Sequence, residues 1–221
     1  EPALDLYLNC HVFDVHSLEN TIQYVEAFQL TTEKRFRFIA PLFADTTGDA
    51  FLAAKAGAVI LRGTESAQDY GEEAAPSSAS AYTMGNSLMF QAIDRGYRVT
   101  FVAPAWANHY SEEDLIHRGH SEIESGYWWI ELGGKQDTVS DFEEIRDDLL
   151  KVVYGVWDHL KNGGDHGADN YDLVWVQALP GKRESRRVLG DYLLTANDLL
   201  ASTRFQDAVA YGGWPIDLHP P

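Results

Sequence analysis

The sequence predicts an α+β fold, in which an antiparallel β-meander precedes a more mixed region with one long helix. Three segments, 4–15, 20–28 and 35–45, alternate apolar and polar side chains and are separated by short polar turns, as in adjacent antiparallel strands. Residues 140–162 instead repeat their apolar side chains every three or four positions until Gly163 and Gly164. This spacing predicts an amphipathic helix of more than five turns.

Shorter elements complete the prediction. A helix is expected over 50–58 and a short one after a Thr195–Asp198 capping box. The remaining expected strands cover residues 86–94, 97–104, 125–132, 171–180 and 205–219. The loop-like composition of residues 62–80 marks an internal boundary. We therefore expect three regions: 1–62, 63–180 and 181–221.

Composition excludes several classes of partner. Acidic residues outnumber basic ones by 34 to 17, for a net charge of -17, which repels nucleic acid and anionic membrane surfaces. No apolar run approaches the roughly 20 residues of a membrane span. A single cysteine, Cys10, excludes an internal disulfide and is compatible with the cytosol or with secretion. The chain opens with Glu-Pro rather than Met, which leaves the compartment unknown.

The segment "ADTTGDA", residues 44–50, lies where a strand is expected to run into a helix. Thr and Gly at such a turn let a ligand approach the backbone, and helix N-terminal amides favour an anion. Asp49 could accept hydrogen bonds from a sugar or ribityl hydroxyl. The alternative is that Asp and Thr only cap the helix. On this segment alone, capping is the favoured interpretation.

Two later segments also have compositions that suit a binding site. "GKRESRR", residues 181–187, concentrates basic side chains in an acidic chain. A continuous strand would place Arg183 and Ser185 on one face and Arg186 on the other; the guanidinium groups suit carboxylate or phosphate, or else form surface ion pairs. In "YGGWPIDLH", residues 211–219, the glycines permit close approach to a flat ring, and His219 could exchange a proton. On this segment alone, a hydrogen-bonded surface histidine is the favoured interpretation.

No metal site is predicted. His109, His117 and His120 lie in one segment and Asp165, His166 and Asp169 in another. Neither segment has the helical His-x-x-x-His spacing that places two imidazoles on one face. We interpret both groups as structural or solvent-facing.

Taken in order, three segments resemble the FAD-dependent oxidoreductases of the glutathione-reductase-like flavoprotein class. The resemblance lies in "ADTTGDAFLAAKAGA", "RESRRVLGDYLLTANDLL" and "FQDAVAYGGWPIDLH", and it covers nearly the whole chain. It is strongest to a branch, often encoded beside polysaccharide-degrading genes, in which some members are labelled xanthan lyase. Family members have glycine where this chain has Ala50.

The resemblance implies a meander and returning strand of an FAD domain (1–62 and 181–221) and a mixed-sheet substrate or cap domain (63–180). The family's N-terminal Rossmann βαβ unit, which holds the pyrophosphate, is expected to precede Glu1, and a closing segment to follow Pro221. The missing N- and C-terminal segments of the same protein would then be partners of this middle portion. By itself the portion is expected to be inactive and to lack FAD.

By the same resemblance, the FAD-binding residues are Thr46, Thr47, Gly48, Asp49, Arg183 and Ser185. Those expected to contact substrate are Tyr192, Trp214 and Asp217. His219 is expected to accept a proton from a substrate hydroxyl, and Arg186 to stabilise negative charge on the reduced flavin.

The expected function is therefore hydride transfer to FAD from a polar small molecule, either sugar-derived or another polar alcohol or acid. The alternative is a non-enzymatic carbohydrate-binding module that stacks sugars on Trp106, Trp128, Trp129 and Trp214. A plain interaction domain is a third interpretation. An open groove joining Gly48, Arg186 and His219 would favour the flavoenzyme, and a flat row of exposed aromatic rings the sugar binder.

Overall fold

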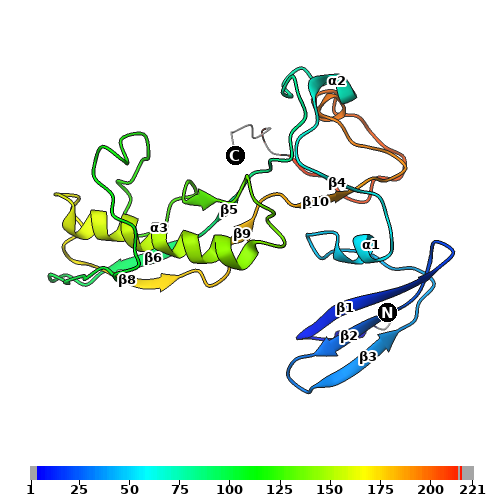
Figure 1. The fold of residues 1–221 in the computed structure, drawn as a ribbon, viewed down its shortest axis with the longest axis horizontal. Coiled ribbons are helices and arrows are strands. Elements are labelled where there is room, and N and C mark those ends of the chain that lie inside the picture. The colour runs from blue at the N-terminus through cyan, green and yellow to red at the C-terminus, as the bar shows by residue number, and fades with distance from the viewer. Residues whose placement is uncertain (1–3, 214, 216–221) are drawn as a thin grey trace. The chain divides into compact units, whose positions relative to one another are not determined.

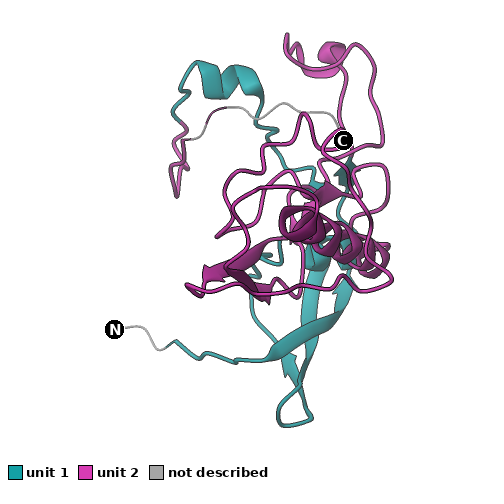
Figure 2. Cartoon of the chain, turned by 90° about the vertical axis from the view of Figure 1, so that its left-hand side faces the viewer, with its two compact units in different colours: residues 1–62, 186–204 teal, residues 63–185, 205–221 magenta. Residues whose placement is uncertain are grey.

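The computed structural model describes residues 4–213 and 215. It confirms a mixed α+β protein with antiparallel sheets and one long helix (Figure 1). The chain forms two compact units. Unit 1 contains the residues up to Arg62 together with Arg186–Arg204, and unit 2 contains Gly63–Ser185 with the residues from Phe205 onward (Figure 2).

Unit 1 begins with the predicted meander. Strands β1 (Cys10–Leu18), β2 (Thr21–Gln29) and β3 (Lys34–Phe38) form one antiparallel sheet in that order. Val25 and Ala27 of the central strand are buried, and the residues on either side of each are half-buried. Strand β3 ends at Phe38, three residues before Pro41, which could not donate to a sheet ladder.

The predicted helix after the polar turn is α1 (Phe51–Lys55), and Gly57 follows it with a positive φ of 89°. Strand β4 (Ile60–Arg62) pairs antiparallel with β10 (Arg186–Val188), so that Arg62 faces Arg186. Helix α4 (Ala196–Leu200) starts with the predicted capping box of Thr195 and Asp198.

Unit 2 is built around α3 (Phe142–Asn162), which lies along the strand pair β6 (Phe90–Asp94) and β8 (Tyr171–Val176) (Figure 1). The predicted apolar stripe faces inward. The buried core combines residues of α3, β6 and nearby loops: Leu88, Phe90, Ala92, Tyr127, Ile130, Ile145, Leu149, Val153, Val156, Trp157, Leu160 and Ala168.

A second small sheet of unit 2 has the order β7-β5-β9. Its strands are β5 (Asn86–Ser87), β7 (Glu131–Leu132) and β9 (Gly181–Lys182). The unit boundary region also contains the short helix α2 (Ala67–Tyr70), which the sequence analysis did not predict.

Several predicted strands are wrong in detail. Residues 97–104 form no strand, and β6 pairs with β8 rather than with them. Only Glu131 and Leu132 of the segment 125–132 are in a strand. The described residues between 205 and 215 contain turns but no strand. Within the described residues, no helix has both the length and the apolarity needed to cross a membrane.

Candidate functional site

The Thr-Gly-Asp turn of unit 1 is held by its own side chains. Thr47 donates to Asp45 through its backbone N–H, at 3.0 Å, and through its hydroxyl, at 2.7 Å. The same hydroxyl oxygen accepts the Phe51 N–H at 2.9 Å, and the second Asp45 oxygen accepts the Ala53 N–H at 2.9 Å. The first turn of α1 is therefore capped by Asp45 and Thr47.

The electrostatics of this turn agree with capping. Burial opposes ionisation of Asp45, but the hydrogen bonds from Ala53 and Thr47 outweigh it and lower the pKa of that carboxyl. A carboxylate already lies against the helix amides. These amides do not offer a phosphate cradle, so the anion-binding interpretation is not supported there.

The turn also has a solvent-exposed side. Thr46, Thr47 and Gly48 are exposed, and Asp49 is half-buried. Gly48 has a φ of 83°, and no atom lies within 4 Å of the position that its Cβ would occupy. Flat or hydroxyl-bearing groups therefore have room to approach the backbone here.

A hydrogen bond joins Arg186, a predicted site residue outside the turn, to the turn itself. Its Nε donates to the backbone oxygen of Asp49 at 2.9 Å. The predicted continuous strand through this segment is interrupted, because residues 183–185 lie between β9 and β10. Arg183 and Ser185 accordingly belong to unit 2, whereas Arg186 belongs to unit 1.

Tyr192, the predicted substrate residue in unit 1, donates its hydroxyl proton to Asp198 at 2.9 Å. That hydrogen bond raises the pKa of the Tyr192 phenol. The Tyr192 hydroxyl therefore contacts the capping box of α4. Trp214, Asp217 and His219 lie outside the described residues, so their predicted roles stay predictions.

Unit 2 contains a separate cleft of about 430 Å³. It is lined by Gly85, Arg118, Trp128, Trp129, Glu131, Leu132, Gly133, Gly134, Lys135 and Gln136. Trp128 is 64% exposed. Trp129 is more enclosed: its ring stacks on Tyr127 with centroids 5.1 Å apart, and the Arg118 guanidinium lies 5.9 Å from its centre.

The carboxylate of Glu131 organises one wall of this cleft. One oxygen accepts the Gly85 N–H at 2.6 Å, and the other pairs with the Arg183 guanidinium. Arg183 was predicted to approach FAD, but in this unit it neutralises Glu131. The aromatic rings, two further cations and backbone groups remain to line the cleft.

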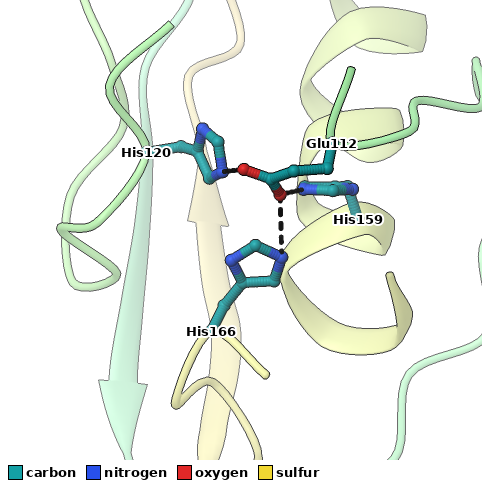
Figure 3. A group of neighbouring side chains, drawn as sticks. All are labelled: Glu112, His120, His159 and His166. Carbon is teal, nitrogen blue, oxygen red and sulfur yellow. Dashed lines mark hydrogen bonds and ion pairs between the residues drawn. The ribbon is translucent and has the colours of Figure 1, made fainter. Parts of the chain in front are cut away.

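Elsewhere in unit 2, Glu112, His120, His159 and His166 lie together (Figure 3). Nε2 of His159 is 3.1 Å from Glu112 Oε2, Nε2 of His166 is 3.7 Å from the same oxygen, and Nε2 of His120 is 3.6 Å from Oε1. The His159 side chain is fully buried, and those of His120 and His166 are only 11% and 15% exposed. Of the two predicted roles, structural or solvent-facing, this burial argues against the solvent-facing one for His120 and His166.

Burial lowers the pKa of His166, and the neighbouring His159 and His120 lower it further. Sequence reasoning missed this cluster because its members come from three separate segments. His159 carried a usable signal. It lies on the buried face of α3, between Val156 and Leu160, and a buried imidazole requires polar partners.

Comparison with known proteins identifies a family. The family model described as FAD dependent oxidoreductase matches residues 1–221. No curated protein matches, and no solved structure matches.

Proposed function

This chain belongs to the FAD-dependent oxidoreductase family. We propose that it is part of a flavoenzyme that oxidises a polar, saccharide-type substrate. The family implies FAD, which accepts a hydride when bound. The single observation that supports a saccharide is the unit 2 cleft, where two tryptophans lie beside Arg118 and Lys135. The xanthan-lyase branch of the family is part of the same proposal.

The turn of unit 1 fits the hydroxyl-bearing or flat parts of FAD better than its phosphates. Its helix amides are already bonded to Asp45 and Thr47. Its exposed Thr46 and the open backbone at Gly48 leave space for a ribityl chain or ring. We assign the phosphates to no described residue.

In this proposal Arg186 is a positioning residue for the turn. Its Nε–H bond to the Asp49 carbonyl ties β10 to the residues before α1. A lysine could supply the charge but not the directional N–H of a guanidinium. The predicted contribution of Arg186 to flavin charge, and of His219 to proton transfer, remains part of the proposal.

The cleft in unit 2 is suited to sugars for two reasons. An aromatic ring face packs against the C–H face of a pyranose, and Trp128 leaves most of its ring exposed for this. The charge of Glu131 is neutralised by its ion pair with Arg183. The other charged side chains that line the cleft, Arg118 and Lys135, are both positive. We therefore propose that the substrate class includes acidic sugars.

Flavin content of the full-length protein tests the oxidoreductase half. Visible absorption and mass spectrometry of released small molecules should show FAD. Arg186→Lys should lower the bound fraction by weakening the turn, and Arg98→Lys, at an exposed arginine of unit 2, is the matched control. An intact full-length protein without flavin would refute this half.

Sugar binding tests the cleft. Calorimetric titration of this chain with glucuronic acid and glucose should show binding that Trp128→Ala removes. Trp106→Ala, which changes another half-exposed tryptophan outside the cleft, should leave it unchanged. Equal losses in both variants would instead support the non-enzymatic sugar-binding platform, and no binding of either sugar would remove the saccharide proposal.

A further inference from the structure

We propose that Glu112, His120, His159 and His166 form a binding site for a divalent transition-metal ion, with Zn²⁺ as the best match. The four residues each offer one ligand atom, and these atoms all lie within 4.8 Å of one another. The proposal concerns unit 2 alone and does not depend on the flavin.

The spacing suits a tetrahedral ion. Metal–ligand bonds of about 2.0–2.1 Å require ligand atoms about 3.4 Å apart. The three distances from Glu112 oxygens to imidazole Nε2 atoms are 3.1, 3.6 and 3.7 Å. The other pairs of ligand atoms lie within 4.8 Å of one another, so side-chain movements would have to bring them closer around one ion.

The tautomers of two imidazoles favour a cation. Nδ1 of His159 lies 3.1 Å from the Tyr110 carbonyl oxygen, and Nδ1 of His120 lies within hydrogen-bond distance of the Arg118 carbonyl oxygen. A carbonyl can only accept, so each Nδ1 carries a proton, and in the neutral form that a metal ion requires the Nε2 lone pair of each ring would be directed inward. Such a backbone contact is the usual outer partner of a metal-bound histidine.

In their neutral forms with the proton on Nδ1, His120 and His159 cannot donate to the Glu112 carboxylate through Nε2. Two Nε2 lone pairs and a carboxylate are all acceptors. Nε2 of His166 is buried and has no hydrogen-bond partner, although unpaired buried polar atoms are costly. One metal ion would satisfy all of them at once.

The surrounding structure holds the ligands in place. His159 lies in the last turn of α3, where the helix dipole favours a positive charge. The loop that carries His166 is tied to the same helix by Lys161, whose Nζ donates to the carbonyl oxygens of Ala168, Asp169 and Tyr171 at 2.7–2.9 Å.

The segment that carries His120 is also held in place. The Tyr127 hydroxyl donates to the His120 carbonyl oxygen at 3.0 Å and also contacts that of Glu122. The ligands thus come from three anchored segments.

The donor set selects the class of ion. Three imidazole nitrogens and one carboxylate oxygen suit Zn²⁺ and its transition-metal neighbours, whereas Mg²⁺ and Ca²⁺ prefer all-oxygen sites. Four protein ligands complete a tetrahedron, which is typical of a structural site. The ion would cross-link two loops to the C-terminal end of α3.

The test is metal binding by this chain after treatment with a chelator. Zn²⁺ should bind one per chain in competition with a chromophoric chelator, and Co²⁺ should give the visible absorption of a tetrahedral ion. His166→Gln and His120→Gln should each weaken Zn²⁺ binding by more than about 100-fold, beyond the effect of losing an outer partner. The control is His117→Gln, which changes an exposed histidine of the same region.

Glu112→Gln keeps the proposal testable if a histidine variant fails to fold, because the Glu112 side chain is 66% exposed. It should weaken Zn²⁺ binding at least about 10-fold while the circular dichroism spectrum is unchanged. The proposal is overturned if wild type binds no Zn²⁺, or if Glu112→Gln and His117→Gln bind it as wild type does.

Discussion

Replacing Gly155 by alanine has two opposing effects on stability: a gain in helix propensity and a loss from overpacking. Gly155 lies inside α3, where alanine is favoured over glycine by about 1 kcal/mol. The Cβ of an alanine there would lie 2.5 Å from the Asn108 carbonyl oxygen and 3.0 Å from Tyr110 Cε2. The close atom belongs to the backbone and cannot rotate away.

The magnitudes decide the sign. To reach an ordinary contact of 3.4 Å, the backbone at Asn108 must move by about 1 Å. Such overpacking costs about 1–3 kcal/mol. The movement also strains the hydrogen bond from Asn108 N–H to the Lys151 carbonyl oxygen, 3.0 Å long, worth about 1 kcal/mol. We therefore expect Gly155→Ala to reduce the free energy of unfolding by about 1–3 kcal/mol.

Urea unfolding followed by tryptophan fluorescence measures this effect, because Trp157 is buried in the core of unit 2. Gly119→Ala is the matched control: no atom lies within 4 Å of its Cβ position, so its stability should change little or rise. If Gly155→Ala instead stabilised the chain by the full propensity difference, the close packing of residues 108–110 on α3 would be wrong.

Three further changes have expected outcomes. Ala50→Gly should raise the free energy of unfolding by up to about 1 kcal/mol, measured in urea, because Ala50 has a φ of 52° that glycine adopts without strain; a loss of stability would contradict this. Lys161→Met should lower it by about 1–3 kcal/mol, since three backbone acceptors lose a charged donor, and an unchanged urea midpoint would refute those bonds. Asp45→Asn should destabilise fully at pH values above about 4, and its effect should shrink as the pH falls further: the folded-state pKa is lowered, so the benefit exists above the unfolded pKa and is lost as pH falls through the folded value. A difference that stayed constant across urea titrations from pH 7 to 3 would count against this linkage.

Local patterns predicted the elements that depend on local interactions. The period of α3 and the capping pair Thr195–Asp198 are visible in the sequence, and both are confirmed. The segment 97–104 shows the opposite case. It alternates like a strand, yet Phe101 packs edge-on against Trp157, and the backbone of the segment does not enter a sheet.

The residues of the turn at 44–50 and of the histidine cluster are brought together by contacts that cannot be read from the sequence. The 44–50 segment suggested two interpretations, and only the acceptor roles of Asp45 and Thr47 separate them. His159 and Glu112 are 47 residues apart, and no spacing rule joins them. Tertiary packing, rather than a motif, brings such residues together.

The antiparallel pairing of β4 with β10 has a consequence for synthesis on the ribosome. Arg62 faces Arg186 across that ladder, so β4 has to wait for its partner until residues 63–185 have emerged. These residues contain α3 and the main core of unit 2, and domains generally fold as units during translation. Unit 2 is therefore expected to fold first. By drawing its two ends together, it would lower the entropic cost of closing the long loop between β4 and β10.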